Sequence, residues 1–250
     1  MSGWVRIAGL GPGADGMVTP EVSGALNAAT DVVGYTPYVA RVCPRPGLSL
    51  HPSDNRAELD RARHALRMAA EGRRVVVVSS GDPGVFAMAA ALFEALETGP
   101  KPWRDLDIRV LPGITAMLAA AARAGAPLGH DFCTINLSDN LKPQALIEKR
   151  LRLAAEGDFA IALYNPRSQA RPEGFARALD ILRETCGDDR PVIFARNVSH
   201  PDETIRVVPL SEAKAEMADM RTVVLIGSAQ TRIIPHRAGP IVYTPRSAPV

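Results

Sequence analysis

Residues 75–86 read Val-Val-Val-Val-Ser-Ser-Gly-Asp-Pro-Gly-Val-Phe. Four consecutive β-branched residues are typical of a central parallel strand that is buried on both faces. A turn with two glycines and a proline follows at once, and in an open α/β sheet such a turn lies at the carboxyl edge, where ligands bind. This stretch therefore predicts an α/β fold and the place of a site within it.

Two further glycine turns follow predicted strands in the first half of the chain. Gly9–Gly13 comes after a strand expected over 4–10, and Pro112–Thr115 comes after one expected over 107–111. Glycine lets the backbone approach a ligand closely, and the start of a helix offers unpaired amides. Three such turns along one sheet edge indicate a ligand site more specifically than any one of them does.

Short β-type runs alternate with Ala- and Leu-rich stretches along the whole chain, which favours α/β architecture throughout. The other strands are expected at 133–137, 159–164, 192–197 and 222–226, with 204–208 pairing antiparallel to its neighbour. Helices are expected at 19–30, 54–71, 85–96, 114–124, 143–155, 174–185 and 211–219.

A break in this pattern divides the chain. The sequence Gly-Ala-Pro-Leu-Gly at 125–129 combines two glycines with a proline near the midpoint. Domain boundaries fall in such stretches. We therefore expect an N-terminal α/β domain over 1–126, a C-terminal α/β domain over 127–245 and a tail at 246–250.

Composition narrows the class of protein. With 46% hydrophobic and 22% charged residues the chain is of globular type, and a net charge of +2 argues against nucleic acid as a partner. No apolar run approaches the length of a membrane helix and no secretory leader is evident, so we expect a cytoplasmic protein without membrane contact. Cys43, Cys133 and Cys186 are too scattered to predict a metal site or a disulfide framework.

A dinucleotide site is one alternative. Gly11–Gly16 fits the pattern GxGxxG, but Pro12 removes an amide donor and the helix signal comes only at Thr19-Pro20. In the dinucleotide fingerprint the helix begins inside the glycine run, so that its amides meet the pyrophosphate. An NAD(P)-dependent reductase is therefore the less favoured interpretation.

The second half contributes two loops after predicted strands, at 163–168 and 195–203. The chain shows no Ser/His/Asp order, HExxH or P-loop. The lack of a nucleophile motif favours chemistry in which a bound cofactor carries the reactive group. A non-enzymatic binding module is less favoured, because strand-end loops occur in both halves.

The ordered turns resemble those of the tetrapyrrole (cobalamin-precorrin) methyltransferase family. Its GxGPG, GDPxxF-like and PGIT patterns match Gly9–Gly13, Gly81–Phe86 and Pro112–Thr115, and the likeness extends from Ile7 to about Ser228. The resemblance implies a homodimer of two-domain α/β chains that binds S-adenosylmethionine, releases S-adenosylhomocysteine, and holds cofactor and tetrapyrrole in the cleft between the domains.

Finer features resemble the ring-contracting branch of that family, above all Tyr164-Asn165-Pro166-Arg167-Ser168 and Ser138-Asp139. Siblings that methylate other carbons often carry an apolar residue in place of Asn165. The resemblance implies methylation of precorrin-3B at C-17 with contraction to precorrin-4, in cobalamin biosynthesis. Action at another carbon, or on the cobalt-bearing substrate, stays open. Diphthine synthase shares the fold and cofactor, but no feature favours it.

The resemblance also assigns residues to roles. Cofactor contacts are implied for Pro12, Gly81, Asp82, Val85, Thr115, Ala116, Asn165 and Val198, with Asp82 nearest the ribose or amino-acid end. Candidates for proton handling during ring contraction are Tyr164, Asp139, His130 and His200. Candidate partners for the substrate carboxylates, which arginine binds well, are Arg41, Arg167, Arg171 and Arg196.

Overall fold

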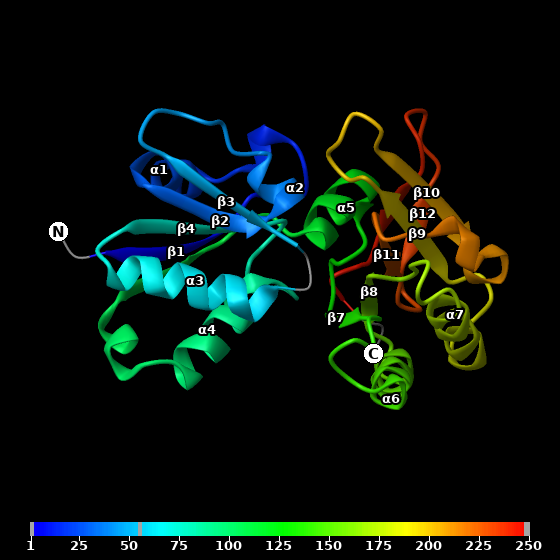
Figure 1. The fold of residues 1–250 in the computed structure, drawn as a ribbon. Coiled ribbons are helices and arrows are strands. Elements are labelled where there is room, and N and C mark those ends of the chain that lie inside the picture. Colours follow the sequence, from blue (N-terminus) through cyan, green and yellow to red (C-terminus); the bar gives the residue numbers. More distant parts are fainter. Residues whose placement is uncertain (1–2, 55–56, 248–250) are drawn as a thin grey trace. The chain divides into compact units, whose positions relative to one another are not determined.

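A computed structural model describes residues 3–54 and 57–247. The chain forms two compact units, Met1–Thr115 and Ala116–Val250 (Figure 1). The boundary thus differs from the one expected after residue 126. The reason is helix α5 (Ala116–Ala124), which contacts strands β10, β11 and β13 of the second unit. The tail expected at 246–250 lies largely outside the described residues.

The first unit is built on a five-stranded sheet of order β3-β2-β4-β1-β5. Every pairing in it is parallel, so all five carboxyl ends lie at one edge. The strands are β1 (Trp4–Gly9), β2 (Asp31–Tyr35), β3 (Ser49–Ser53), β4 (Arg74–Ser79) and β5 (Asp107–Leu111). The predicted parallel α/β sheet is confirmed.

Helices cover both faces of this sheet. The helices of the first unit are α1 (Pro20–Ala28), α2 (Thr36–Val39), α3 (Glu58–Ala70) and α4 (Met88–Thr98), with 3-10 turns η1 (Asp15–Met17) and η2 (Lys101–Asp105). Helices α3 and α4 lie on one face and α1 and α2 on the other (Figure 1). Val75 and Val77 of β4 pack with α3 and α4, whereas Val76 and Val78 pack with α1 and α2. Successive strand side chains point to opposite faces, which explains why a central strand needs an unbroken apolar run.

The start of α1 follows the expected capping signal. Thr19 accepts a hydrogen bond from the amide of Val22 at 3.3 Å, and Pro20 occupies the first helical position. This arrangement pairs one of the amides that a helix start leaves without a partner. Helices α3 and α4 begin later than predicted, at Glu58 and Met88.

The second unit has a mixed five-stranded sheet of order β10-β9-β11-β8-β7. Its strands are β7 (Phe132–Asn136), β8 (Ala160–Tyr164), β9 (Pro191–Arg196), β10 (Thr204–Pro209) and β11 (Thr222–Ile226). Strands β7 and β8 are parallel, and β11 is antiparallel to both β8 and β9. Strands β7, β8 and β9 therefore share a direction, and their carboxyl ends lie at one edge. Strand β10 pairs antiparallel to β9, as predicted.

Helices α6 (Gln144–Glu156) and α7 (Gly174–Thr185) pack on the core side of this sheet, against residues such as Ile161, Leu163 and Phe194. A small separate sheet joins β6 (Gly125–Ala126), β12 (Arg232–Ile234) and β13 (Ile241–Tyr243), which the sequence did not predict.

The prediction of a helix over 211–219 is wrong. Two 3-10 turns, η3 (Leu210–Glu212) and η4 (Ala215–Met217), replace it. Ala213 and Lys214 between them are extended, with ψ of 130° and 148°. Extended backbone there allows Ala213 and Ala215, only two positions apart, to be buried together. A helix would have turned one of them away from the core.

The longest helices, α3 and α6, have 13 residues each. Within residues 3–54 and 57–247, no helix is long and apolar enough to cross a membrane.

A buried carboxylate at the amino end of β2 joins this strand to β3 and to the residue that precedes β4. Asp31 is 1% exposed and lies 2.8 Å from both His51 Nε2 and Arg73 Nη1, while the Thr30 hydroxyl donates to it at 2.7 Å. Burial acts to raise the pKa of this carboxyl, but the three hydrogen bonds outweigh it and hold the pKa below its usual value of 3.8.

Replacing Asp31 with Asn should lower the free energy of unfolding at pH 7 by about 2 kcal/mol, because the charge-assisted hydrogen bonds are lost. A lowered folded-state pKa stabilises the protein fully above 3.8, and this stabilisation is lost as the pH falls through the folded-state value. Urea denaturation of the parent protein and of the Asp31→Asn variant should therefore give a difference in the free energy of unfolding that becomes smaller below pH 3.8. Asp60→Asn on α3, where the side chain is 82% exposed, is the control. A difference independent of pH would contradict this account.

Candidate functional site

Two of the glycine turns of the first unit are joined through their backbones. Gly11 donates to the carbonyl of Gly81 at 3.2 Å, and Gly81 donates back to the carbonyl of Gly11 at 2.9 Å. Both glycines have left-handed backbone, with φ of 67° and 62°. A Cβ atom is unfavourable in this conformation, so glycine is required at both positions of the pair.

The third turn lies against the other two. A Cβ on Gly9 would lie 2.5 Å from the carbonyl oxygen of Gly81 and 2.8 Å from the Cα of Gly113. A Cβ on Gly113 would overlap that same carbonyl oxygen. The three turns that follow β1, β4 and β5 are thus in backbone contact at the carboxyl edge, as the sequence predicted from parallel strands.

Asp82 holds the second and third turns together. Its Oδ1 accepts from the amide of Gly84 at 2.8 Å, and its Oδ2 accepts from the amide of Gly113 at 3.0 Å. Asp82 does not cap the next helix, since α4 begins at Met88 with Ala87 in the cap position. Both carboxylate oxygens accept from backbone amides, so this geometry supports a positioning role more directly than the predicted contact with the ribose or amino-acid end of the cofactor.

Arg41 plays a similar part for the first turn. Its Nη2 donates to the carbonyls of Leu10 at 2.5 Å and Gly13 at 3.0 Å, and its Nη1 donates to Gly11 at 3.2 Å. Burial lowers the pKa of this guanidinium. The structure therefore places Arg41 on the carbonyls of the glycine turn, whereas the sequence predicted that it binds a substrate carboxylate.

The remaining cofactor candidates of this unit lie in or beside the same turns. Pro12 separates Gly11 from Gly13, the amide of Val85 donates to the carbonyl of Asp82 at 3.2 Å, and Thr115 is buried. Next to them, Phe86 is 48% exposed and has a left-handed φ of 53°. Strained backbone of this kind occurs often at ligand sites, and the GDPxxF-like pattern ended at Phe86 without assigning it a contact.

The glycine run does not open a helix. After Gly13 the chain passes through η1 and reaches helix α1 only at Pro20. The helix amides that a dinucleotide pyrophosphate requires are therefore absent from the Gly11–Gly16 run, which disfavours the NAD(P) alternative.

In the second unit, two asparagines join the ends of β7 and β8. Asn165 Nδ2 donates to Asn136 Oδ1 at 3.0 Å, and the amide of Ser138 donates to the same oxygen at 2.9 Å. Asn165 has a left-handed φ of 52°, a conformation that asparagine adopts more readily than most residues. Asn136 was not predicted, although a polar residue at the end of a strand was the available signal.

Tyr164 connects this edge to helix α5. Its hydroxyl oxygen accepts from the amide of Met117 at 2.9 Å, in the first turn of the helix. The predicted residues Ala116, Tyr164 and Asn165 are thereby brought together.

The loop after β9 contains strained backbone on both sides of Val198. Asn197 and Ser199 have φ of 49° and 67°, and Val198 between them is 5% exposed. The amide of Ser199 donates to Glu203 Oε2 at 2.6 Å. His200, a predicted catalytic residue, has an exposed side chain in this loop, and its amide donates to the carbonyl of Asn197 at 2.9 Å.

Arg196 is paired with acidic side chains. Its Nε donates to Asp219 at 2.9 Å, and its Nη1 lies 3.9 Å from Asp202. Burial acts to raise the pKa of Asp219, but hydrogen bonds from Arg196, Thr222 and the Arg221 amide hold it below the usual value. Arg196 therefore meets carboxylates of its own chain, where the sequence predicted those of a substrate.

The other two predicted arginines lie near the ends of β7 and β8. Arg171 Nη1 donates to the carbonyl of Leu137 at 3.4 Å, and its Nε lies 3.7 Å from Asp139. Arg167 is half-buried in the loop that follows Asn165. Both lie beside the carboxyl ends of β7 and β8, but Arg171, like Arg196, meets a carboxylate of its own chain.

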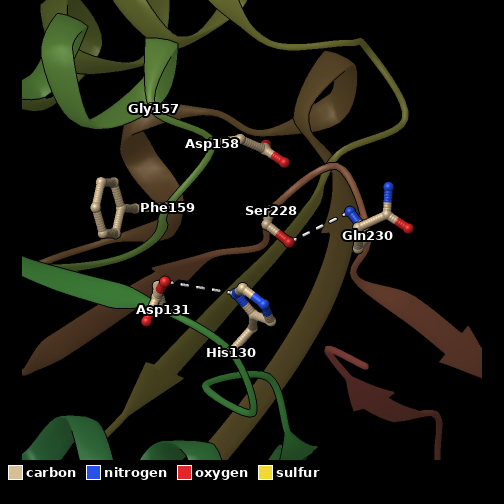
Figure 2. A pocket seen from close by; sticks show the side chains of 7 residues that line it. All are labelled: His130, Asp131, Gly157, Asp158, Phe159, Ser228 and Gln230. Atoms are coloured by element: carbon tan, nitrogen blue, oxygen red, sulfur yellow. Dashed lines mark hydrogen bonds and ion pairs between the residues drawn. The ribbon is translucent and has the colours of Figure 1, made fainter. Parts of the chain in front are cut away.

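His130 lies at the opposite edge of the second sheet. It lines a cavity of about 150 Å³, and its Nδ1 is 3.9 Å from Asp131 (Figure 2). The other lining residues are Gly157, Asp158, Phe159, Ser228 and Gln230. They precede β7 and β8 or follow β11, so the cavity is separated from Tyr164 by the length of a strand. No three His, Cys, Asp or Glu side chains in the described ranges could hold a metal ion.

The fold and these turns define a class: an α/β protein of two units, each of which presents glycine- or asparagine-bearing turns at the carboxyl ends of its strands. The sequence matches Tetrapyrrole (Corrin/Porphyrin) Methylases over residues 5–214. The chain belongs to the tetrapyrrole methylase family.

Individual relatives are similar over almost the whole chain. A precorrin-3B C(17)-methyltransferase from a Sinorhizobium species is 54% identical over 98% of this chain and 97% of its own. The methyltransferase CobJ, for which a crystal structure exists, is 69% identical in sequence to this chain. The two structures match over 98% of this chain and 100% of that one, with a TM-score of 0.93. The uroporphyrin-III C-methyltransferase of Thermus thermophilus, complexed with S-adenosylhomocysteine, shares the fold at 21% identity, with a TM-score of 0.67 over 90% and 92% of the two chains.

Substituting Gly113 with Ala should push the glycine turns apart, since the new Cβ would overlap the Gly81 carbonyl. We expect a loss of roughly 1–3 kcal/mol in the free energy of unfolding, measured by urea denaturation. Gly16→Ala is the matched control, because its Cβ would meet nothing within 4 Å. It should change stability by less than about 0.5 kcal/mol. Equal effects of both substitutions would contradict the close packing of the turns.

Proposed function

We propose that this chain transfers a methyl group from S-adenosylmethionine to C-17 of precorrin-3B, with contraction of the macrocycle, in the biosynthesis of cobalamin. The observation that carries this proposal is the 54% identity, over almost the full length of both chains, to a precorrin-3B C(17)-methyltransferase. Membership of the tetrapyrrole methylase family supports the same reaction class.

The turns of the first unit fit the proposed cofactor. Gly9 and Gly113 let the three turns pack backbone to backbone, and Phe86 and Ile114 are 48% and 36% exposed beside them. Backbone polar groups suit ribose hydroxyls and an amino acid, while exposed apolar side chains suit a purine. The Thermus thermophilus enzyme forms a complex with S-adenosylhomocysteine, which supports this choice for the shared fold.

Bound S-adenosylmethionine would supply a methyl group on a sulfonium, which an electron-rich ring carbon attacks in line from a distance of about 3 Å. The reduced tetrapyrrole is itself the nucleophile, so the protein needs no nucleophilic side chain. The contribution of this chain is then to align the reactants and to exclude water.

For the proton transfer that ring contraction requires, we propose Tyr164. Its hydroxyl lies at the carboxyl edge of β8 and accepts the amide of Met117, so its orientation is fixed. His130 lies at the far edge, Asp139 is within 3.7 Å of Arg171, and His200 is exposed.

We further propose Arg167 and Arg171 as partners of the substrate carboxylates, and a homodimer as the assembly that the family resemblance implies.

Incubation of the purified chain with S-adenosylmethionine and precorrin-3B, followed by mass and absorbance of the product, tests the proposal. We expect a gain of one methyl group and a ring-contracted, precorrin-4-like product. Turnover only with the cobalt-bearing substrate would move the assignment to the anaerobic form of the step. Methylation at another carbon would move it to a sibling enzyme, and failure to bind S-adenosylhomocysteine would overturn the reaction class.

Asp82→Ala removes the acceptor of two backbone amides, so the second and third turns should separate. We expect affinity for S-adenosylhomocysteine, measured by calorimetry, to fall roughly ten- to a hundredfold. If Asp82 acts by positioning, affinity for a 2′,3′-dideoxy analogue should fall by the same factor. A direct ribose contact would instead make the loss smaller for the analogue. Asp105→Ala, at an exposed position of η2, is the control.

A further inference from the structure

Helix α5 connects three predicted cofactor-binding segments of the second unit. Ala116 is its first residue, and its Met117 amide donates to the hydroxyl of Tyr164, next to Asn165. In its last turn, Arg123 Nε lies 3.2 Å from Glu203, which closes the loop that contains Val198. Contacts at both ends of one helix therefore link segments that are far apart in the sequence.

The backbone conformation of the loop around Val198 is energetically unfavourable. Asn197 and Ser199 carry a Cβ but have φ of 49° and 67°. Left-handed backbone is unfavourable for such residues and persists only where surrounding contacts enforce it. Asn197 is supported by its side chain, whose Nδ2 donates to Asp202 at 2.5 Å.

Glu203 provides the corresponding support for Ser199. Its Oε2 accepts from the Ser199 amide at 2.6 Å, a short charge-assisted hydrogen bond. Its own amide donates to the carbonyl of His200 at 3.0 Å, so the carboxylate acts from within the same closed loop. The side chain of Glu203 is 22% exposed and that of Arg123 48%. Solvent weakens an ion pair at such exposure, so the hydrogen bond from Glu203 to the Ser199 amide supports the loop more than the ion pair with Arg123 does.

We propose that Glu203 is a positioning residue of the methyl-transfer site, which holds Ser199 in left-handed backbone so that Val198 meets the cofactor. Arg123 orients the Glu203 carboxylate from helix α5. This inference rests on the proposed function and on the cofactor contact that the family resemblance implies for Val198.

The test uses Glu203→Ala and Ser199→Gly, separately and together, with S-adenosylhomocysteine affinity measured by calorimetry on the full chain. Loss of the carboxylate should weaken binding about tenfold, because the strained turn is no longer enforced. Glycine adopts left-handed backbone freely, so Ser199→Gly in the Glu203→Ala background should restore affinity to within about threefold of the parent. A purely structural defect elsewhere in the unit would not be rescued by this glycine.

Further variants keep the test decisive. Glu212→Ala, at an exposed glutamate of η3, should bind like the parent protein. If Glu203→Ala does not fold, Glu203→Gln still offers an oxygen to the Ser199 amide and should weaken binding less than tenfold. Arg123→Ala should also weaken binding, by a smaller factor than Glu203→Ala.

Unchanged affinity in a folded Glu203→Ala variant would overturn the inference, as would a double variant that binds no better than Glu203→Ala alone. Both outcomes leave the proposed function intact, provided that the parent chain binds S-adenosylhomocysteine. If the parent does not bind it, the proposed function fails instead, and the two failures are thereby distinguished.

Discussion

Backbone contact among three glycines is the constraint on which the first unit depends. Parallel strands bring the turns after β1, β4 and β5 to one edge, and Gly9, Gly81 and Gly113 let them touch there. A side chain on Gly9 or Gly113 would compete with the neighbouring backbone for the same space, and Gly81 has left-handed backbone that favours glycine. The glycines therefore determine the path of the chain at the edge of the sheet where a ligand is expected.

Charged residues near these turns act on the backbone. Asp82 accepts two amides and Arg41 donates to three carbonyls, so the charges of both are used within the protein. In the second unit Arg196 is likewise engaged by Asp219. A motif shows that a charged residue follows a strand, but it does not show whether that residue faces the ligand or the adjoining turn. For this reason the sequence located the turns of the first unit correctly, whereas the roles that the resemblance implied for Asp82 and Arg41 stay predictions.

The fold was predictable wherever burial was continuous. The run Val75–Val78 and the cap Thr19-Pro20 each have one favourable conformation, and both predictions are confirmed. Strand β3 was missed because Ser49–Ser53 contains Pro52 and polar residues, which only an edge strand tolerates. The segment 211–219 has helical composition, yet the core needs both Ala213 and Ala215. That requirement comes from the packing of the second unit and is not visible in local propensity.

For the second unit, the direction of the strands separates the site candidates more sharply than residue type does. Strands β7, β8 and β9 share a direction, so residues that end or follow them, such as Asn136, Asn165 and Asn197, lie at one edge. His130 precedes β7 and is placed at the other edge by the same rule, although histidine is the commoner acid or base. The sequence shows that His130 precedes a predicted strand, whereas Tyr164 ends one. This difference would have separated His130 from Tyr164 among the candidates for proton transfer. Asn136 could have been included on the same ground, because it ends a strand whose neighbour carries Asn165.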